Sequence, residues 1–400
     1  MVRALFFLPN IRGYPDRVSL LKEVSRGLDG LTLLVGQMDA EVDTAGYDRF
    51  TVVDAGFRRG WLPRNMWRAS RMAEEMVRDA GVDVVHDTFG ALLPLFWRKR
   101  RHPSAWYLTS LYNLVAWRSR HVWGQVSVWY FLRQNKRMFF KRWIERQICL
   151  SADSVVLQAP GLVGRLLEDV PIPRERVRVL LNSVDTDFWS PRDPPLKEQT
   201  AQDECRVLFV GGIDYSRGIF ALIEMIRLLK KHACPARLTI VGRWGALGKE
   251  EALALISNHG FEKDISFLPT LGRERLRELY RDSDVFVYQT NNAGTPRVVL
   301  EALACGLPVV ASRHPGIDVI DPGDDFIAFT DFGDANQMAR FVRDFSERPE
   351  IWQQRAKAGR QAVEDRFSIP TVARQYVEFY QSLTESAPAG RASADDRAPL

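Results

Sequence analysis

Cysteine and histidine are scarce in this chain of 400 residues, and the few that occur show no ligand spacing. The cysteines stand alone at Cys149, Cys205, Cys234 and Cys305, and the six histidines are equally scattered. A structural zinc site needs four such ligands at short intervals, so we expect no metal. Isolated cysteines of this kind are typical of buried free thiols in a reducing compartment.

Long apolar runs are missing as well. No segment reaches the roughly 18–20 apolar residues that a membrane-spanning helix needs. Met1 leads directly into Val2–Leu8, which has the pattern of a first strand rather than of a signal peptide. No G-x-G-x-x-G follows that strand and no G-x-x-x-x-G-K-[ST] occurs, so a nicotinamide dehydrogenase and a P-loop nucleotidase are disfavoured.

Acidic residues are absent between Thr88 and Ile144, although this stretch of 57 residues holds eleven Lys and Arg. Trp, Tyr and Phe are interleaved with these cations, and Phe57–Arg68 has a similar basic-aromatic character. The combination favours an anionic membrane surface as the partner of residues 88–144, with ordinary core packing of the rings as the alternative. No nucleic-acid partner is expected, because no recognisable reading module is present and the residues after 190 carry a net charge of −3.

Strand-like and helical patterns alternate through the chain, which predicts parallel α/β sheets, and the length predicts two domains. Strands are predicted at Val2–Leu8, Leu31–Val35, Phe50–Asp54, Asp83–Asp87, Ala105–Ser110, Ser154–Leu157, Val177–Asn182, Arg206–Val210, Arg237–Gly242, Ile265–Pro269, Val285–Tyr288 and Pro308–Ser312. Helices are predicted at Asp16–Gly27, Asn65–Asp79, Ser127–Leu150, Gly161–Leu167, Gly218–His232, Lys249–His259, Arg273–Asp282, around Glu301, and at Ala335–Glu347, Ile351–Asp365 and Thr371–Leu383.

The segment Asn292–Ser312 is a Gly-containing loop, then a helix opening near Thr295 and Pro296, then a turn into a strand. Pro suits the first helical position because its missing N–H would be unpaired there anyway. Free backbone N–H groups and the helix dipole favour a phosphate or diphosphate at such a helix start, and an ordinary βαβ turn is the alternative. Glu301, one to two turns into the helix, could accept hydrogen bonds from sugar hydroxyls.

Together with that segment, three others resemble the retaining, GT-B-fold glycosyltransferases of family 4. They are Val207–Gly218, Leu181–Phe188 and Asp264–Tyr288, and the likeness runs from about residue 152 to 380. It implies two Rossmann-like, doubly wound domains facing a central cleft. Residues 1–190 would form the acceptor domain, 191–204 a linker and 205–370 the nucleotide-sugar domain. Helix 371–383 would cross back to the first domain, and residues 384–400 have the composition of a disordered tail.

The chain departs from the family pattern at three places. Ala293 stands where the first of two paired glutamates is usual, eight positions before Glu301, and Gly212 stands where an Arg is usual. Thr109 or Ser110 occupies the place of the active-site His of the first domain. These departures leave open a catalytically inactive homologue that acts as a binding partner or scaffold in glycan assembly.

The resemblance implies a metal-independent hexosyl transfer from a nucleotide-diphospho-sugar, with retention of configuration and with no cofactor. A lipid-linked or polysaccharide-precursor acceptor is expected, at the cytoplasmic face of a membrane. Arg217 and Glu301 are the principal predicted site residues, for the leaving diphosphate and the ribose respectively. The remaining donor-binding predictions are Gly211, Gly212, Arg243, Gly294, Thr295, Pro296, Arg297 and Val298.

The first domain offers weaker candidates. Asn10, Arg12 and Gly13 follow its first strand, in the loop that GT-B enzymes keep near the reacting sugar, and Thr109 is a further acceptor candidate. Asp87, predicted to end its strand at the cleft, is a candidate base for the acceptor hydroxyl.

Overall fold

The computed structural model describes residues 2–11, 15–57, 63–88, 90–99, 102, 104–110, 143–192, 204–245, 248–290 and 294–385. These residues form two compact units. The first unit combines the chain up to Ser183 with the segment from Ile369 onward, and the second begins at Val184 and ends at Ser368. The division therefore falls before residue 190, where the sequence placed the end of the first domain.

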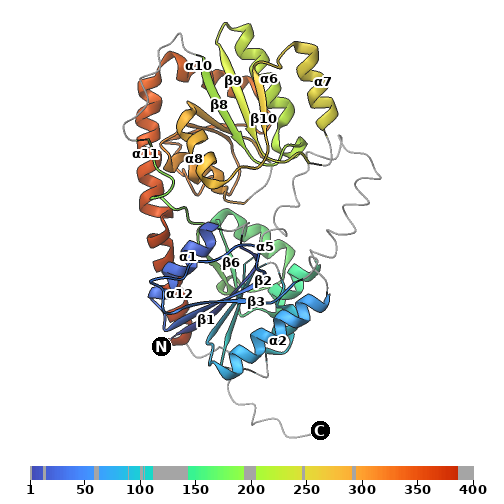
Figure 1. The fold of residues 1–400 in the computed structure, drawn as a ribbon, viewed down its shortest axis with the longest axis vertical. Helices are drawn as coiled ribbons and strands as arrows, with labels where there is room; N and C mark the ends of the chain where they lie inside the picture. Colours follow the sequence, from blue (N-terminus) through green and yellow to red (C-terminus); the bar gives the residue numbers. More distant parts are fainter. Residues whose placement is uncertain are drawn as a thin grey trace. The chain divides into compact units, whose positions relative to one another are not determined.

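The first unit is built on a parallel sheet with the strand order β3-β2-β1-β4-β5-β6-β7 (Figure 1). Its strands are β1 (Arg3–Asn10), β2 (Gly30–Gln37), β3 (Phe50–Asp54), β4 (Val84–Thr88), β5 (Trp106–Ser110), β6 (Ser154–Leu157) and β7 (Val177–Val179). The order reverses between β1 and β4. In open α/β sheets such a reversal opens a crevice at the carboxyl ends of the strands.

Helices pack against this sheet on both faces. They are α1 (Pro15–Arg26), α2 (Pro63–Asp79), α3 (Leu93–Trp97), α5 (Val163–Asp169) and α12 (Ile369–Glu385), and residues 143–151 are also helical. α1 and α12 lie side by side (Figure 1) and share one buried cluster with alternate residues of β1, namely Ala4, Phe6 and Leu8. Alternation along a strand turns the residues between them to the opposite face. The last helix of the chain is thus part of the first unit's core.

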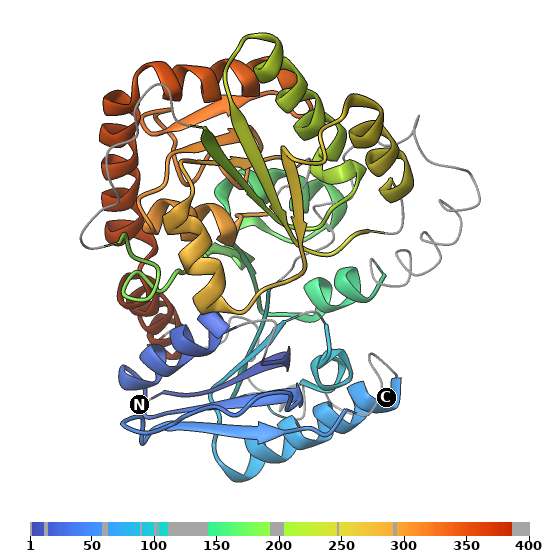
Figure 2. The same ribbon diagram turned by 45° about the horizontal axis from the view of Figure 1, so that its top comes forward.

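The second unit contains a parallel sheet with the order β10-β9-β8-β11-β12-β13. Its strands are β8 (Cys205–Val210), β9 (Ala236–Val241), β10 (Ile265–Leu268), β11 (Val285–Tyr288), β12 (Val309–Ser312) and β13 (Ile327–Thr330). Its helices are α6 (Ile219–Lys231), α7 (Lys249–His259), α8 (Arg273–Asp282), α9 (Arg297–Ala304), α10 (Ala335–Glu347) and α11 (Pro349–Phe367). Figure 2 shows these helices on both sides of the strands.

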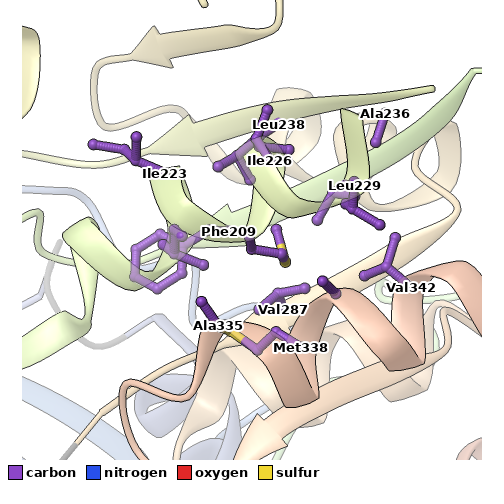
Figure 3. Close-up of a cluster of buried hydrophobic side chains, with 14 of the residues drawn as sticks. Phe209, Ile223, Ile226, Leu229, Ala236, Leu238, Val287, Ala335, Met338 and Val342 are labelled. Carbon is purple, nitrogen blue, oxygen red and sulfur yellow. The ribbon is translucent and has the colours of Figure 1, made fainter. Parts of the chain in front are cut away.

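The core of the second unit lies where α6 and α10 meet the sheet. Leu229 of α6 and Met338 and Val342 of α10 are buried against Phe209 and Val287 of the strands (Figure 3). These side chains come from four elements, and the helical ones recur at the spacing of three and four residues that lines one helix face. Their burial fixes α6 over β8, and with it the turn that leads from β8 into α6.

The predicted elements agree with the structure in type and order, with few exceptions. β13 and the short helix α3 were not predicted, and β7 ends three residues earlier than predicted, at Val179. Pro296 is the N-cap of α9, with extended backbone, so the expectation that it occupies the first helical position is wrong. Most of the predicted helix Ser127–Leu150, and most of the predicted linker and tail, lie outside the described residues.

The expectations for membrane-spanning helices and for cysteines can be compared with the described residues. No helix within them is both long and apolar enough to span a bilayer. The four cysteines are free and buried, as predicted. Burial raises the pKa of the Cys305 thiol to about 12, so this thiol stays protonated at neutral pH.

Candidate functional site

The strand order of the second unit reverses between β8 and β11, so a crevice is expected at the carboxyl ends of these two strands. The segment after β8 passes through a 3-10 turn, Tyr215–Arg217 (η6), into α6. The segment after β11 leads to the start of α9. Topology therefore brings together the Arg217 turn and the Thr295 segment, which were predicted as one donor site.

Arg217 is held at this edge by hydroxyl groups. Its guanidinium donates to the Tyr288 hydroxyl at 2.9 Å and to Thr290 Oγ1 at 3.0 Å, both at the end of β11. Asp214 caps the turn by accepting from the Ser216 amide at 2.9 Å. Both partners of Arg217 are neutral and the side chain is only half-buried, so its positive charge is oriented by these partners without being neutralised by them. A cation oriented in this way suits an anionic ligand.

Glycine at position 218 allows this turn to lie close to β11. Gly218 has a left-handed backbone with φ of 67°, and a Cβ added there would lie 2.9 Å from the Cβ of Gln289. Gln289 in turn donates to Thr330 Oγ1 at 3.0 Å and accepts from the Gly333 amide at 3.0 Å. The turn, β11 and β13 are therefore packed as one block beneath Arg217.

The loops after β8 and β9 continue the strand pairing. Gly211 donates to the Val241 carbonyl at 3.0 Å, and a Cβ on Gly242 would lie 1.8 Å from the Gly211 carbonyl oxygen. Only glycine tolerates that approach at position 242. Gly212 and Arg243 are exposed at the ends of these two loops, where both were predicted. No contact in the described residues assigns either of them to a donor.

The start of α9 offers main-chain N–H groups. Thr295 and Pro296 are buried, whereas Gly294, Arg297 and Val298 are half-buried. Pro296 caps the helix with no side-chain hydrogen bond and has no N–H of its own. The prediction that main-chain amides near Pro296 bind an anion stays a prediction.

Glu301 is almost completely buried, with 8% of its surface exposed. Its Oε2 accepts a hydrogen bond of 3.1 Å from the hydroxyl of Tyr280, on α8. The same hydroxyl lies 3.3 Å from the Val298 carbonyl, so Tyr280 ties the side chain of Glu301 to the first turn of α9. Tyr280 was not predicted, because nothing in the local sequence pairs residues 21 positions apart.

In the first unit, the prediction for Asp87 needs correction. β4 continues through Thr88, so Asp87 lies within the strand, and it is fully buried rather than facing a cleft. Burial raises the pKa of its carboxyl well above the ordinary value of 3.8, although the amides of Gly90, Ala91 and Leu92 oppose that rise. A carboxyl enclosed in this way does not face a cleft, and its raised pKa disfavours the carboxylate form that a general base requires.

The other acceptor candidates are placed as follows. Thr109 is fully buried and is the register partner of Asp87 on β5, and its Oγ1 has no hydrogen bond in the described structure. Asn10 ends β1 and is half-buried. Arg12 and Gly13 lie outside the described residues.

Sequence reasoning missed His86, which neighbours Asp87 but faces the other side of the sheet. Its Nδ1 lies 2.6 Å from the Tyr380 hydroxyl of α12, and its Nε2 lies 2.7 Å from Ser110 Oγ on β5. Complete burial, aided by the positive charge of Arg17, lowers the pKa of His86 to about 3. His86 is thus a neutral bridge between the sheet and the last helix, and its distant partners gave no signal in the sequence.

No cluster of three or more His, Cys, Asp or Glu side chains that could hold a metal ion occurs among the residues described. What the second unit presents instead is one oriented guanidinium, the start of α9 and glycine-lined loops at the β8/β11 crevice. Such groups are suited to an anionic ligand.

Two parallel, doubly wound sheets in one chain, with the last helix returning to the first, define the GT-B class of proteins. Solved structures agree. The sucrose-phosphate synthase of Thermosynechococcus elongatus superimposes with a TM-score of 0.74 at 18% identity, covering 96% of this chain and 100% of that one. HepE of Anabaena, in complex with UDP and glucose, superimposes with a TM-score of 0.71 at 16% identity over the same shares of the two chains.

The sequence comparisons define the family. The model for glycosyl transferases group 1 matches residues 195–363, and the model for glycosyltransferase family 4 matches residues 31–188. The D-inositol 3-phosphate glycosyltransferase of Xylanimonas cellulosilytica is 26% identical over 269 residues, which is 61% of this chain and 60% of that protein. The chain thus aligns with less than two thirds of that relative. It belongs to the group 1, family 4 glycosyltransferases.

Proposed function

We propose that this protein transfers a hexosyl unit from a nucleotide-diphospho-sugar, with retention of configuration, to a lipid-linked or polysaccharide-precursor acceptor. The observation that carries the proposal is the Arg217 guanidinium, held by Tyr288 and Thr290 at the β8/β11 crevice. A nucleoside diphosphate gains negative charge as it leaves the sugar. A fixed cation and oriented amides stabilise that charge without reorganisation at the moment of reaction.

The same geometry supports a nucleotide as part of the donor. The diphosphate would lie between Arg217 and the amides at the start of α9, and the ribose would reach toward Glu301. HepE, a structural neighbour, binds UDP and glucose, which supports a nucleotide sugar as the donor class. Arg243 and Arg297, at loop and helix starts of the same unit, are the proposed substitutes for the Arg that Gly212 replaces.

The acceptor is proposed from the first unit's sequence. The stretch from residue 88 to 144 has eleven basic and no acidic residues, which suits an acceptor presented at an anionic membrane surface. The chain would then act at the cytoplasmic face of that membrane.

Donor binding is tested by isothermal titration of the full chain with UDP, UDP-glucose and GDP. Arg217→Ala should weaken nucleotide binding by about tenfold to a hundredfold, because a charged hydrogen bond contributes about 1.5–3 kcal/mol. Tyr288→Phe is the matched control, since it removes one partner of the guanidinium and leaves the cation in place. Equal nucleotide affinity in wild type and Arg217→Ala would refute the proposed donor site.

A catalytically inactive homologue is the second candidate, favoured by two observations. Glu301 already accepts a hydrogen bond from Tyr280, and Asp87 is fully buried with a raised carboxyl pKa. A chain of this kind would bind nucleotide without turnover. Release of UDP from UDP-glucose, in the presence of membrane extract and lost in Glu301→Ala, would exclude it.

A further inference from the structure

Among the residues that the structure describes, three tryptophans lie half exposed on the first unit, which is unusual for a side chain of this size. Trp67 is 49% exposed, Trp97 51% and Trp143 48%. Leu150 is 37% exposed and stands seven positions after Trp143 in the same helical segment, so the two share one helix face. We name Trp67, Trp97, Trp143 and Leu150 the tryptophan patch.

Ring and cation contacts link the three tryptophans of this patch, although they come from three separate segments. The rings of Trp97 and Trp143 pack edge to face with centroids 6.3 Å apart. Arg98, next to Trp97 in the chain, places its guanidinium carbon 5.2 Å from the centre of the Trp67 ring. Glu74 of α2 accepts from Arg98 at 2.8 Å and so holds that guanidinium in place. The indoles are therefore fixed on the surface, close to one another.

The surface beside the patch is basic. Trp67 shares the exposed side of the first three turns of α2 with Arg64, Arg68 and Arg71. Arg146 is exposed between Trp143 and Leu150. The acidic residues of α2 come later in the helix, and the one nearest the patch, Glu74, is already paired with Arg98 and His102.

We propose that the tryptophan patch and the exposed arginines of α2 form a docking surface for an anionic lipid membrane. Indoles bury their apolar body at the level of the headgroups while the ring N–H stays hydrated. Arginines at the same level meet lipid phosphate. The occupant is inferred from charge and ring type together: an apolar protein partner would not select arginines around the rings.

The proposal deepens the proposed lipid-linked acceptor, since a docked first unit would meet that acceptor at the membrane. It can nevertheless be tested without donor or turnover. Vesicle binding can therefore succeed where sugar transfer fails, and the reverse also holds.

The experiment is co-sedimentation of the full chain with vesicles of phosphatidylcholine alone and of phosphatidylcholine mixed with phosphatidylglycerol. Wild type should bind the mixed vesicles and lose binding as salt is raised, because salt screens exposed charges. Neutralising Arg64, Arg68 and Arg71 to Gln should weaken binding by about fivefold per charge. The charge control replaces three exposed lysines with Gln: Lys231, Lys249 and Lys357.

The aromatic part is tested with the double variant Trp97→Ser and Trp143→Ser, which should bind about tenfold more weakly. Its control is Leu253→Ser with Ile351→Ser, two residues of the second unit that are 41% and 45% exposed. A cooperative urea-unfolding transition in each variant shows that the chain is folded.

Every outcome of the vesicle-binding experiments either supports or overturns the proposal. Loss of vesicle binding in the patch variants and not in the controls supports the proposal. No binding of wild type to the mixed vesicles overturns it, as does equal loss in patch and control variants. Binding of wild type to RNA or to an acidic protein in place of vesicles would also overturn it.

Discussion

Replacing Gly218 by Ala tests whether the Arg217 turn depends on close packing against β11. A Cβ at Gly218 would lie 2.9 Å from the Cβ of Gln289, an atom that cannot move without its backbone. Gly260, at the end of α7, supplies a matched comparison. Its φ is 66° against 67° at Gly218, and an added Cβ would meet nothing within 4 Å. The two substitutions therefore share the backbone strain and differ in the contact.

The expected magnitudes follow from that difference. A left-handed conformation costs a residue other than glycine about 1–2 kcal/mol, partly offset by the lower entropy of the unfolded chain. Gly260→Ala should thus lower the free energy of unfolding by about 1 kcal/mol. Gly218→Ala adds an overpacked contact of about 1–3 kcal/mol. The turn should also shift, which moves Arg217 from Tyr288 and Thr290 and weakens UDP binding by about tenfold or more.

The assay is urea unfolding of wild type and both variants, with titration of UDP under native conditions. Both glycines belong to the second unit, so the same unfolding transition reports on each of them. Equal loss of stability in the two variants would refute the packing argument. Unchanged UDP affinity in a folded Gly218→Ala protein would show that the position of Arg217 is not what binds the nucleotide.

Three further predictions concern buried polar groups. The folded-state pKa of His86, about 3, lies below its ordinary value of 6.5, so its contribution is present above pH 6.5 and is lost as pH falls toward 3. Urea unfolding of wild type should then lose about 3–5 kcal/mol more over that interval than unfolding of His86→Gln. The pH dependence of stability has the opposite sign for Asp87, because its pKa is raised: stability is lost as pH rises above 3.8. Asp87→Asn should therefore be more stable than wild type at neutral pH, as measured by urea unfolding. A less stable variant would contradict this. Tyr280→Phe removes the hydrogen bond to Glu301 and should lower the free energy of unfolding, measured with urea, by about 1–3 kcal/mol. An unchanged free energy of unfolding would mean that another group holds Glu301.

Much of the fold could be predicted because its elements are encoded locally. Lys249–His259, Arg273–Asp282 and Val285–Tyr288 have the same bounds in the sequence prediction and in the structure. Their apolar residues recur at the period of a helix or form a short buried run between polar segments. β13 escaped prediction because it follows a long turn segment, Arg313–Phe326, with no regular pattern before it.

The candidate site was predictable only in part. The sequence indicated Arg217 and the α9 start through a family likeness, and strand order brought the two segments to one edge of the sheet. The burial of Asp87 was missed because a single strand pattern does not show what covers the strand. Assigning Asp87 to the end of β4, rather than to its interior, produced the wrong role.

The sequence by itself determined the alternation of strands and helices, the two sheets and the family, because these depend on periodicity and on the order of short motifs. Only the tertiary structure decided the partners of the polar side chains. Arg217 bonds a residue 71 positions away, and His86 one that is 294 positions away. Such pairs depend on strand order, register and helix packing, which bring distant residues together and which no local pattern of the chain specifies.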